Sequence, residues 1–520
     1  MKLLPIVCLW VLVSMCDGYR ILGVFPFNGK SHFVMFEHMM KSLAKKGHQV
    51  DVISTFPLKK PFPNYTDLVV LPVSSINMVN NMSFELLNDV FKASATYCVS
   101  VIAGNSVCDN LGHEKIQKLV HDPPKDPPYD LLILEIFGAH CYAAIGHILK
   151  VPVVGVSSSV LYPWSNDMIA NPENLAFAPN NLLSYSQHMS FSQRTYNLLH
   201  TLYNKFYFNY ATREQNEIMR KYLGPGLPDI RELENSVAMI LTNSHMSMNG
   251  IKDTAPALIE VGGLHVQEEG VELPASLEKW MNESTSGFMY FSFGSMVKIE
   301  SFPAKYLEIF YNSLGKIAPV RVLMKIPNPS ELPPGLPKNI HILPWIPQVK
   351  VLKHRNIKAF ITHGGLMGTQ EAIHYGVPLI GIPLFADQFI NIDTYVRNNI
   401  AVGLDIETLT QEEMDKALHA ILHDPKYRDT VRKISAKFLD RPLSATDTAV
   451  YWIEYIIRHG ADALRSPAMD LTWWQVQLLD VYAFLLVVAL LSVYLLIVAV
   501  RFVLKSANGN QKVSNKKKVS

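Results

Sequence analysis

The sequence predicts an α/β protein with two parallel, helix-covered sheets, one in each half of the chain. The length of 520 residues exceeds what one ordinary core holds and is sufficient for two domains. From Arg20 onward, apolar runs alternate with helix-period segments, and the same alternation restarts after a polar, acidic connection at 267–286. We therefore expect an N-terminal domain at 19–266 and a C-terminal domain at 287–440.

The first half opens with a βαβ unit. The strand "ILGVFPF" is followed by the polar loop "NGKSH", a helix from about Phe33 to Lys46 and the strand "QVDVIST". Further on, "YDLLILEI" and "VPVVGVSS" frame a second helix from about His140 to Leu149. The stretch 163–221 is helical or irregular, "GPGLPDI" ends it, and the strand "VAMILTNS" follows.

The second half supplies the strands "GFMYFSFGSM", "VRVLMKI", "NIHIL", "IKAFITH" and "VPLIGIP". Helical segments between most of them favour a parallel sheet covered by helices. Two such domains in tandem imply a cleft between them, where ligands commonly bind. The amphipathic segment "SATDTAVYWIEYIIRHG" lies in a return segment, 441–478, which we expect to pack back across the first domain.

The first residues, "MKLLPIVCLWVLVSMCDG", combine a lysine, an apolar run and small residues, as a secretory signal does. We expect a signal peptide at 1–18, cleaved close to Tyr19. A buried N-terminal strand is the alternative, but the apolar run is unbroken and a better strand follows it.

A transmembrane helix is predicted at 479–501. Its core, Val481 to Val500, carries no charge and has the length needed to cross the bilayer hydrocarbon. The tail, 502–520 together with the bounding Arg501, holds six basic residues and no acid, so the positive-inside rule places it in the cytosol. The domains are then lumenal, in a single-pass type I topology.

The ending "KKVS" resembles the dilysine signal of membrane proteins that reside in the endoplasmic reticulum. A basic stretch resting on anionic membrane lipid is the alternative. Sequons at Asn64, Asn81 and Asn282 fit glycosylation in the lumen.

Charge and cysteine content exclude some classes of function. The formal charge is +2, and without the six basic residues of the tail about −4 remains, which offers no surface for nucleic acid. Three cysteines follow the signal, which is too few for a disulfide scaffold. If one bridge forms, we expect it between Cys98 and Cys108, with Cys141 outside it. No Cys-x-x-Cys spacing indicates a metal.

The segment "AFITHGGLMGTQEAIHYGVP" predicts an anion site. Its strand delivers His363, Gly364 and Gly365 to the start of a helix near Leu366, where free amides and the helix dipole favour a phosphate. An ordinary strand-to-helix turn is the alternative for this segment alone.

The flanking residues extend the anion site towards a nucleotide-sugar. Trp345 offers a ring on which a base can stack, and Gln348 offers amide groups to a base edge. Glu371 can accept hydrogen bonds from ribose hydroxyls, while Asp387 and Gln388 supply the acceptor and amide that a hexose requires. Base, ribose, diphosphate and hexose each have a candidate partner.

The stretch from Trp345 to Asn391 resembles the signature of the UDP-glycosyltransferase family, particularly its insect members. The resemblance implies the glycosyltransferase B architecture, with two facing Rossmann-like domains, and a UDP-sugar as co-substrate without a further cofactor. Position by position, it implies contacts of uracil with Trp345 and Gln348, of ribose with Glu371, of the diphosphate with Ser295, His363 and the Gly365, Gly368 and Thr369 backbone, and of the sugar with Asp387 and Gln388.

The candidate base is His32 in "NGKSHFVMFEHMM". It stands at a helix N-terminus, where the dipole disfavours imidazolium and keeps the ring able to accept a proton. The family commonly orients this base with an aspartate, and the matching place holds Glu135. The alternatives are a surface histidine and a buried structural carboxylate, and His140 offers another polar contact.

The expected function is transfer of a hexose to a small lipophilic acceptor, with inversion at the anomeric carbon and a role in detoxification; glucose is the favoured donor sugar and glucuronate the alternative. Residues 84–210 are expected to contribute the acceptor pocket. A catalytically silent, membrane-anchored ligand-binding protein is the alternative, and homo- or hetero-oligomers are left open. A dinucleotide oxidoreductase is disfavoured because no G-x-G-x-x-G follows the first strand.

Overall fold

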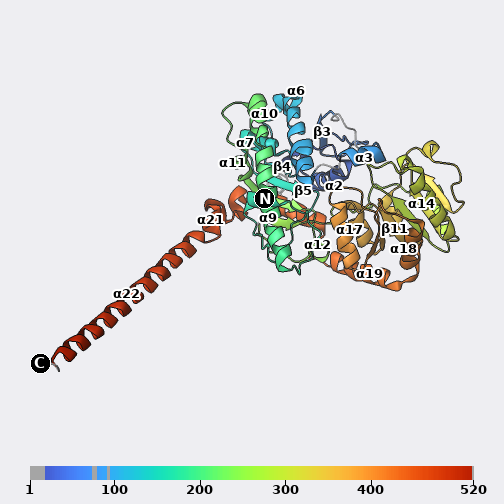
Figure 1. Ribbon diagram of the computed structural model, residues 1–520. Helices are drawn as coiled ribbons and strands as arrows, with labels where there is room; N and C mark the ends of the chain where they lie inside the picture. Colours follow the sequence, from blue (N-terminus) through green and yellow to red (C-terminus); the bar gives the residue numbers. More distant parts are fainter. Residues whose placement is uncertain (1–17, 73–78, 91–93, 518–520) are drawn as a thin grey trace, which may run out of the picture. The chain divides into compact units, whose positions relative to one another are not determined.

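The computed structural model describes residues 18–72, 79–90 and 94–517. The predicted signal peptide lies outside the described residues except for Gly18. The chain divides into two compact units, one through Arg465 and one from Ser466 onward. Both predicted sheets lie in the first unit, blue to green and yellow to orange in Figure 1.

The first sheet has seven parallel strands in the order β3-β2-β1-β4-β5-β6-β7. Their bounds are β1 Arg20–Phe25, β2 Gln49–Ser54, β3 Tyr65–Val70, β4 Leu131–Glu135, β5 Val153–Ser157, β6 Val237–Thr242 and β7 Leu258–Glu260. The central strand β4 is buried along its whole length, because helices cover both faces of a parallel sheet.

The helices of this half occupy the connections. They are α2 Lys30–Lys45, α3 Phe84–Val90, α4 Ala95–Tyr97, η1 Cys98–Asn105, α5 Ser106–Cys108, η2 Asp109–Gly112, α6 Glu114–His121, η3 His140–Tyr142, α7 Ala143–Leu149, α8 Pro163–Asn166, η4 Asp167–Ile169, α9 Phe191–Ala211, α10 Glu214–Leu223, α11 Ile230–Glu234 and α12 Met246–Asn249. The expected first βαβ unit is formed by β1, α2 and β2.

The second sheet has six parallel strands in the order β10-β9-β8-β11-β12-β13. Their bounds are β8 Phe288–Ser292, β9 Arg321–Lys325, β10 Ile340–Leu343, β11 Ile357–Thr362, β12 Leu379–Gly381 and β13 Ala401–Gly403. The helices that accompany them are α13 Ala275–Glu283, η5 Ile299–Ser301, α14 Ala304–Lys316, η6 Pro329–Glu331, α15 Gln348–Lys353, α16 Leu366–His374, α17 Gln388–Arg397, α18 Gln411–His423 and α19 Pro425–Leu439.

Helix α13 lies inside the stretch 267–286 that the sequence predicted as a polar connection. Its Leu277 and Met281, one helical turn apart, are buried in a core cluster with Phe288 of β8. Because the stretch is mostly polar and acidic, its two apolar residues did not predict a helix. Since α13 packs on Phe288, the core of the second domain begins before its first strand.

Helix α20 (Ala445–His459) returns to the first sheet, as predicted. Ala449, Val450, Ile453 and Ile456 are buried in the same core cluster as β1 and β4. The first half therefore completes its core with residues from the far end of the second half. The 3-10 turn η7 (Ala461–Leu464) follows, and Arg465 donates to the Asn235 carbonyl at 3.1 Å.

The second unit contains η8 Pro467–Asp470, α21 Trp473–Val476 and the long helix α22 Leu479–Lys517 (Figure 1). Within α22, Leu479–Ser506 has a peak mean hydropathy of 3.0 and none of that window is buried. Among the described residues, this is the one helix long and apolar enough to cross a membrane, judged by length and composition.

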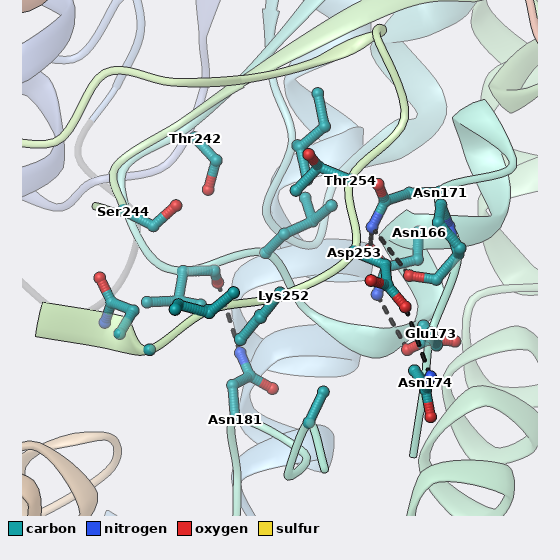
Figure 2. A pocket seen from close by; sticks show the side chains of 18 of the residues that line it. Asn166, Asn171, Glu173, Asn174, Asn181, Thr242, Ser244, Lys252, Asp253 and Thr254 are labelled. Atoms are coloured by element: carbon teal, nitrogen blue, oxygen red, sulfur yellow. Dashed lines mark hydrogen bonds between the residues drawn. The ribbon is translucent and has the colours of Figure 1, made fainter. Parts of the chain in front are cut away.

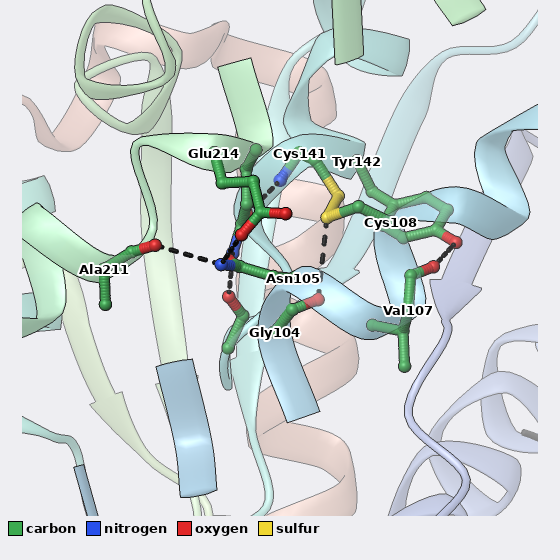
Figure 3. The surroundings of a disulfide bond; sticks show 10 residues. Gly104, Asn105, Val107, Cys108, Cys141, Tyr142, Ala211 and Glu214 are labelled. Carbon is green, nitrogen blue, oxygen red and sulfur yellow. Dashed lines mark hydrogen bonds between the residues drawn. A yellow bond between two sulfur atoms is a disulfide. The ribbon is translucent and has the colours of Figure 1, made fainter. Parts of the chain in front are cut away.

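The expected Cys98–Cys108 bridge is wrong: the disulfide joins Cys108 to Cys141 (Figure 3). Cys98 and Cys108 stand ten residues apart on the continuous helical run α4-η1-α5, a separation of roughly 15 Å at an α-helical rise. A disulfide needs Cα atoms about 4.4–6.8 Å apart. Cys141 in η3 meets that limit, with its Cα 6.2 Å from that of Cys108.

Candidate active site

The carboxyl ends of β1 and β4 bring His32 and Glu135 together. The two strands are neighbours and parallel, so the residues that follow them meet at one edge of the sheet. The Nδ1 atom of His32 lies 3.1 Å from Oε1 of Glu135, and the Phe27 N–H donates to Oε2 at 3.3 Å. Glu135 is 2 % exposed. A carboxylate that accepts from Nδ1–H leaves Nε2 of His32 as the ring's proton acceptor.

Aromatic side chains surround His32. The rings of Phe27 and Phe137 lie 4.9 and 4.8 Å from the imidazole, centroid to centroid. Tyr162 lies 5.9 Å beyond Phe137 and stacks on Trp164. All of these rings come from the first half of the chain, and they form an apolar wall beside the imidazole.

His140 contacts a different carboxylate from the one beside His32. Its Nδ1 pairs with Oε1 of Glu234, and both residues are buried. The histidine that the Glu135 carboxylate orients is therefore His32 and not His140.

The turn after β11 is the one in which the sequence predicts an anion site. Gly364 adopts φ +89°, a left-handed conformation that glycine permits, and α16 begins at Leu366. The N–H groups in the first turn of a helix have no carbonyl partner within it. The N–H of Thr369 already donates to the Gly365 carbonyl at 3.1 Å. The donors available to an anion are therefore those of residues 366–368.

The Thr369 side chain is also committed within the protein. Its buried hydroxyl lies 3.0 Å from the Tyr395 hydroxyl and 3.1 Å from the Gly365 carbonyl. Gly368 approaches Gln348 closely, because a Cβ at Gly368 would lie 3.0 Å from Nε2 of Gln348.

His363 packs between two glycines. A Cβ at Gly294 would lie 2.7 Å from its Nε2, and a Cβ at Gly365 would lie 2.8 Å from its Cε1. Burial, aided by the nearby Lys325, lowers the pKa of His363 to about 3. The imidazole is therefore neutral at physiological pH and offers a hydrogen bond rather than a charge.

Lys325, at the end of β9, is a residue that the sequence reasoning missed. Its Nζ donates to the Gly294 carbonyl at 2.7 Å and to Asn80 Oδ1 at 2.6 Å, and it lies 5.5 Å from the Trp345 ring centroid. Burial lowers its pKa to about 8, so the ammonium stays mostly protonated at neutral pH. The available signal was its place at the carboxyl end of a buried strand.

The loop of Ser295 follows β8 at the same edge of the sheet. The Ser295 carbonyl accepts from the Asn80 N–H at 2.8 Å, and Met82 pairs with the adjacent Met296 and Lys298 backbone. A segment of the first half thus holds this loop beside Lys325.

Gln348 and Glu371 form a hydrogen-bonded pair. Nε2 of Gln348 donates to Glu371 Oε2 at 2.7 Å, and the Tyr290 hydroxyl donates to Gln348 Oε1 at 3.1 Å. Burial raises the pKa of Glu371 to about 7. Trp345 is 57 % exposed, so its ring is accessible to a ligand.

Asp387 and Gln388 stand at the start of α17. Asn391 donates to both Asp387 Oδ2, at 2.8 Å, and the Gly364 carbonyl, at 3.0 Å, which ties α17 to the anion turn. Gln388 Oε1 accepts the N–H groups of residues 384 and 385. Burial raises the pKa of Asp387, and a charged His32 opposes that rise, so the two halves meet here.

Backbone and amide contacts fix α16 against the first half. Gln370 accepts from the Gly263 N–H at 2.9 Å and donates to the Asn243 carbonyl at 3.0 Å. His265 Nε2 lies 3.0 Å from the Met367 carbonyl. These contacts hold the start of α16 against the segments that follow β6 and β7. No cluster of His, Cys, Asp or Glu in the described part of the chain is arranged to hold a metal ion.

Comparison with known proteins places this geometry among glycosyltransferases. The family model described as "UDP-glucoronosyl and UDP-glucosyl transferase" matches residues 21–514. UDP-glucosyltransferase 2 of Dactylopius coccus is 35% identical over 94% of this chain and 93% of its own length. Human UDP-glucuronosyltransferase 1A10 is 29% identical over 93% of this chain and 91% of its own.

Solved structures show the same fold. Phytolacca americana UGT2, complexed with UDP-2fluoro-glucose and pterostilbene, aligns over 85% of this chain and 100% of its own, with a TM-score of 0.58 and 16% identity. Glycosyltransferase VinC in complex with dTDP aligns over the same share of this chain, with a TM-score of 0.56 and 15% identity. The predicted glycosyltransferase B architecture is confirmed.

Proposed function

Because the chain belongs to the UDP-glycosyltransferase family, we propose that it transfers a hexose from a UDP-sugar to a hydroxyl of a small lipophilic acceptor, with His32 as general base. The contact between His32 Nδ1 and the buried Glu135 carboxylate, at 3.1 Å, is the observation that carries this proposal. It leaves Nε2 free to accept the acceptor's proton and places a negative charge behind the imidazolium that forms.

The acceptor hydroxyl, once deprotonated, attacks the anomeric carbon in one displacement, which inverts its configuration. The bond to the UDP oxygen breaks as the new glycosidic bond forms, and the proton stays on His32. Negative charge develops on the leaving diphosphate. The first-turn N–H groups of α16 and the Lys325 ammonium support its stabilisation, because such donors need no rearrangement during the reaction.

The donor contacts follow from the same arrangement. We assign Trp345 and Gln348 to uracil, Glu371 to ribose, Ser295, His363 and Lys325 to the diphosphate, and Asp387 and Gln388 to the sugar. For Gly365, Gly368 and Thr369 the proposed role is to shape the turn, with the N–H groups of residues 366–368 as the donors. A UDP-sugar is then the co-substrate, and the residues assigned here carry the reaction without a further cofactor.

Glucose is the donor sugar that we favour. The similarity to UDP-glucosyltransferase 2 of Dactylopius coccus, at 35% identity, supports it. Glucuronate is the second candidate, because UDP-glucuronosyltransferases match over a comparable length at 29% identity.

The proposed location is the endoplasmic reticulum membrane. The apolar α22 supports a single span, and the basic residues after it support a cytosolic tail and lumenal domains. Asn64, Asn81 and Asn282 are exposed, as glycosylated asparagines must be, and a lipophilic acceptor would partition into the adjoining bilayer.

The test is UDP release by microsomes that contain the protein, with UDP-glucose or UDP-glucuronate and a panel of phenols, beside a His32→Ala control. Acceptor-dependent release with one donor, lost in the control, supports the transferase and identifies its sugar. A product with retained configuration contradicts the direct displacement. UDP binding without release from any acceptor favours the alternative, a catalytically silent ligand-binding member of the family.

A further inference from the structure

Two adjoining cavities lie along the carboxyl edge of the first sheet. The larger, of about 290 Å³, is bounded by residues 160–181 and 242–260, and we call it the annex (Figure 2). The smaller, of about 210 Å³, reaches Tyr162 on one side and Leu366 and Asp387 on the other. Asn181 and Lys252 line both cavities, so the annex opens towards the proposed catalytic cleft.

One wall of the annex is a fixed polar network. Asn166 donates to Glu173 at 2.9 Å, Asn171 donates to Asn166 at 2.8 Å, and Asn174 donates to Asp253 at 3.4 Å (Figure 2). These side chains hold one another in place. The annex therefore presents polar groups whose positions do not depend on a ligand.

Two polar groups at the shared boundary lack this support. Asn181 Oδ1 is buried and accepts no hydrogen bond, although its Nδ2 donates to the Val160 carbonyl at 3.3 Å. The Lys252 ammonium forms no hydrogen bond or ion pair with any residue that the structure describes, and burial lowers its pKa. The nearest acids are engaged elsewhere, Glu260 with the Ser244 hydroxyl and Glu173 with Lys205.

Asn181 Oδ1 is thus a buried acceptor without a partner, and Lys252 Nζ, on a half-buried residue, is a donor without a protein partner among the described residues; together they select the chemistry of the ligand. A hydroxyl donates and accepts, so hydroxyl groups satisfy both Asn181 Oδ1 and Lys252 Nζ. A carboxylate only accepts and would face Glu173, Asp253 and Glu260 in the same cavity. An apolar group would leave both partners unsatisfied.

We infer that the annex binds an uncharged, polyhydroxylated group carried by the acceptor, held by Asn181 and Lys252. The inference rests on the proposed function, because the ligand of the annex is an acceptor only if the protein is a transferase. It adds the chemical class of that acceptor. The acceptors would then include compounds that already carry a sugar or a comparable polyol, with the reactive hydroxyl near His32.

The test is equilibrium binding to the detergent-solubilised full chain carrying His32→Ala, in the presence of UDP. Three probes share a phenol and differ at the opposite ring position: hydroquinone mono-β-glucoside, 4-methoxyphenol and 4-hydroxybenzoate. Each is measured also with Lys252→Met, with the conservative Lys252→Arg, and with Lys279→Met, which removes a lysine that is 78% exposed on α13. UDP affinity reports whether each variant is folded.

We expect the glucoside to bind about tenfold more tightly than 4-methoxyphenol, as hydrogen bonds to a charged group predict. Lys252→Met should abolish that preference, Lys252→Arg should restore part of it, and Lys279→Met should leave it unchanged. Equal affinities for the glucoside and 4-methoxyphenol overturn the inference. So does tightest binding of 4-hydroxybenzoate that Lys252→Met removes, which would identify an anion site.

The binding readout separates this inference from the proposed function. His32→Ala removes the proposed base, so the probes are compared whether or not the protein transfers a hexose. If Lys252→Met lost UDP binding, the ranking of the three probes on the parent chain would still decide between polyol, anion and apolar ligands.

Discussion

At the scale of single residues, Glu135 reaches two donors that lie on different segments. Its carboxylate contacts the His32 imidazole with one oxygen and the Phe27 N–H with the other. The resemblance to the family implies an aspartate here, and the glutamate of this chain reaches both donors. The longer side chain therefore keeps the orientation of the imidazole defined.

Substitution Glu135→Gln should lower kcat by about 100-fold or more, because an amide cannot stabilise the imidazolium that proton transfer creates. Its oxygen can still accept from Phe27, so the fold and UDP affinity should be retained. The measurement is kcat beside the Kd for UDP, with Glu234→Gln, which alters the separate His140 pair, as control. A loss of UDP affinity as large as the loss of kcat would contradict the assignment.

The buried Glu371 should make nucleoside binding depend on pH. Ribose hydroxyls donate to its ionised form, so affinity should rise with pH through its pKa of about 7 and then level off. Between pH 6 and 8 the expected gain is roughly tenfold. Calorimetric titration with uridine measures it, since uridine has no phosphate that ionises in this range.

The two polar groups closest to Glu371 do not change their charge between pH 6 and 8. Gln348 does not titrate, and burial lowers the pKa of His265, 3.8 Å away, to about 4. Glu371→Gln should bind uridine with little change across the same range. A dependence that survives this substitution would point to another titrating group.

The resemblance to the family predicted the His32–Glu135 pair, because Glu135 stands at the place of the family's aspartate, and the structure brings the two side chains together. The sequence did not predict Lys325, whose contacts are Gly294, 31 residues away, and Asn80, 245 residues away. A single lysine at the end of a strand matches no local sequence motif that would predict a binding role. Its contacts with Gly294 and Trp345 depend on the folding of the second half, and its contact with Asn80 depends on the packing of the first half against the second.

At the scale of elements, the helical run α4-η1-α5 and the turn η3 are joined by the Cys108–Cys141 disulfide across 33 residues. A loop of that length predicts a contribution of roughly 3 to 4 kcal/mol to stability, through the unfolded chain. Cys108→Ala or Cys141→Ala should therefore lower the unfolding temperature of the oxidised protein.

Thermal unfolding in detergent, with and without reductant, measures this contribution. Reductant should lower the unfolding temperature of the parent chain towards that of the single variants. Cys98→Ser is the matched control and should leave the effect of reductant intact. An equal unfolding temperature for Cys108→Ala and the parent would contradict the stabilising role.

Element prediction succeeded where apolar periodicity was long and failed where it was short. Most strands of the two sheets and α20 carry runs or stripes that identify them, whereas β3 and β13 were not predicted and α13 has only Leu277 and Met281 in an acidic stretch. The cysteine pairing failed because sequence proximity favours Cys98–Cys108, while a rigid helix holds those residues apart. Geometry imposed by an element outweighs proximity along the chain.

At the scale of the whole molecule, the first half is not a continuous piece of sequence. Its core includes Ala449, Val450, Ile453 and Ile456 of α20, and His48 lies 3.1 Å from Glu454 of the same helix. A truncation that ends before α20 removes part of this core. Burial of four aliphatic side chains is a large share of the free energy of unfolding of a domain.

Two truncations test this organisation together with the role of α22. A chain ending at Arg465 keeps α20 and both sheets, so it should fold, bind UDP and leave the membrane pellet after alkaline carbonate extraction. A chain ending at Asp440 should be unstable and fail to bind UDP, because the first core loses α20. If the chain ending at Arg465 stayed in the pellet, the exposed apolar side chains of α9, such as Leu202 and Phe206, would be implicated in membrane contact.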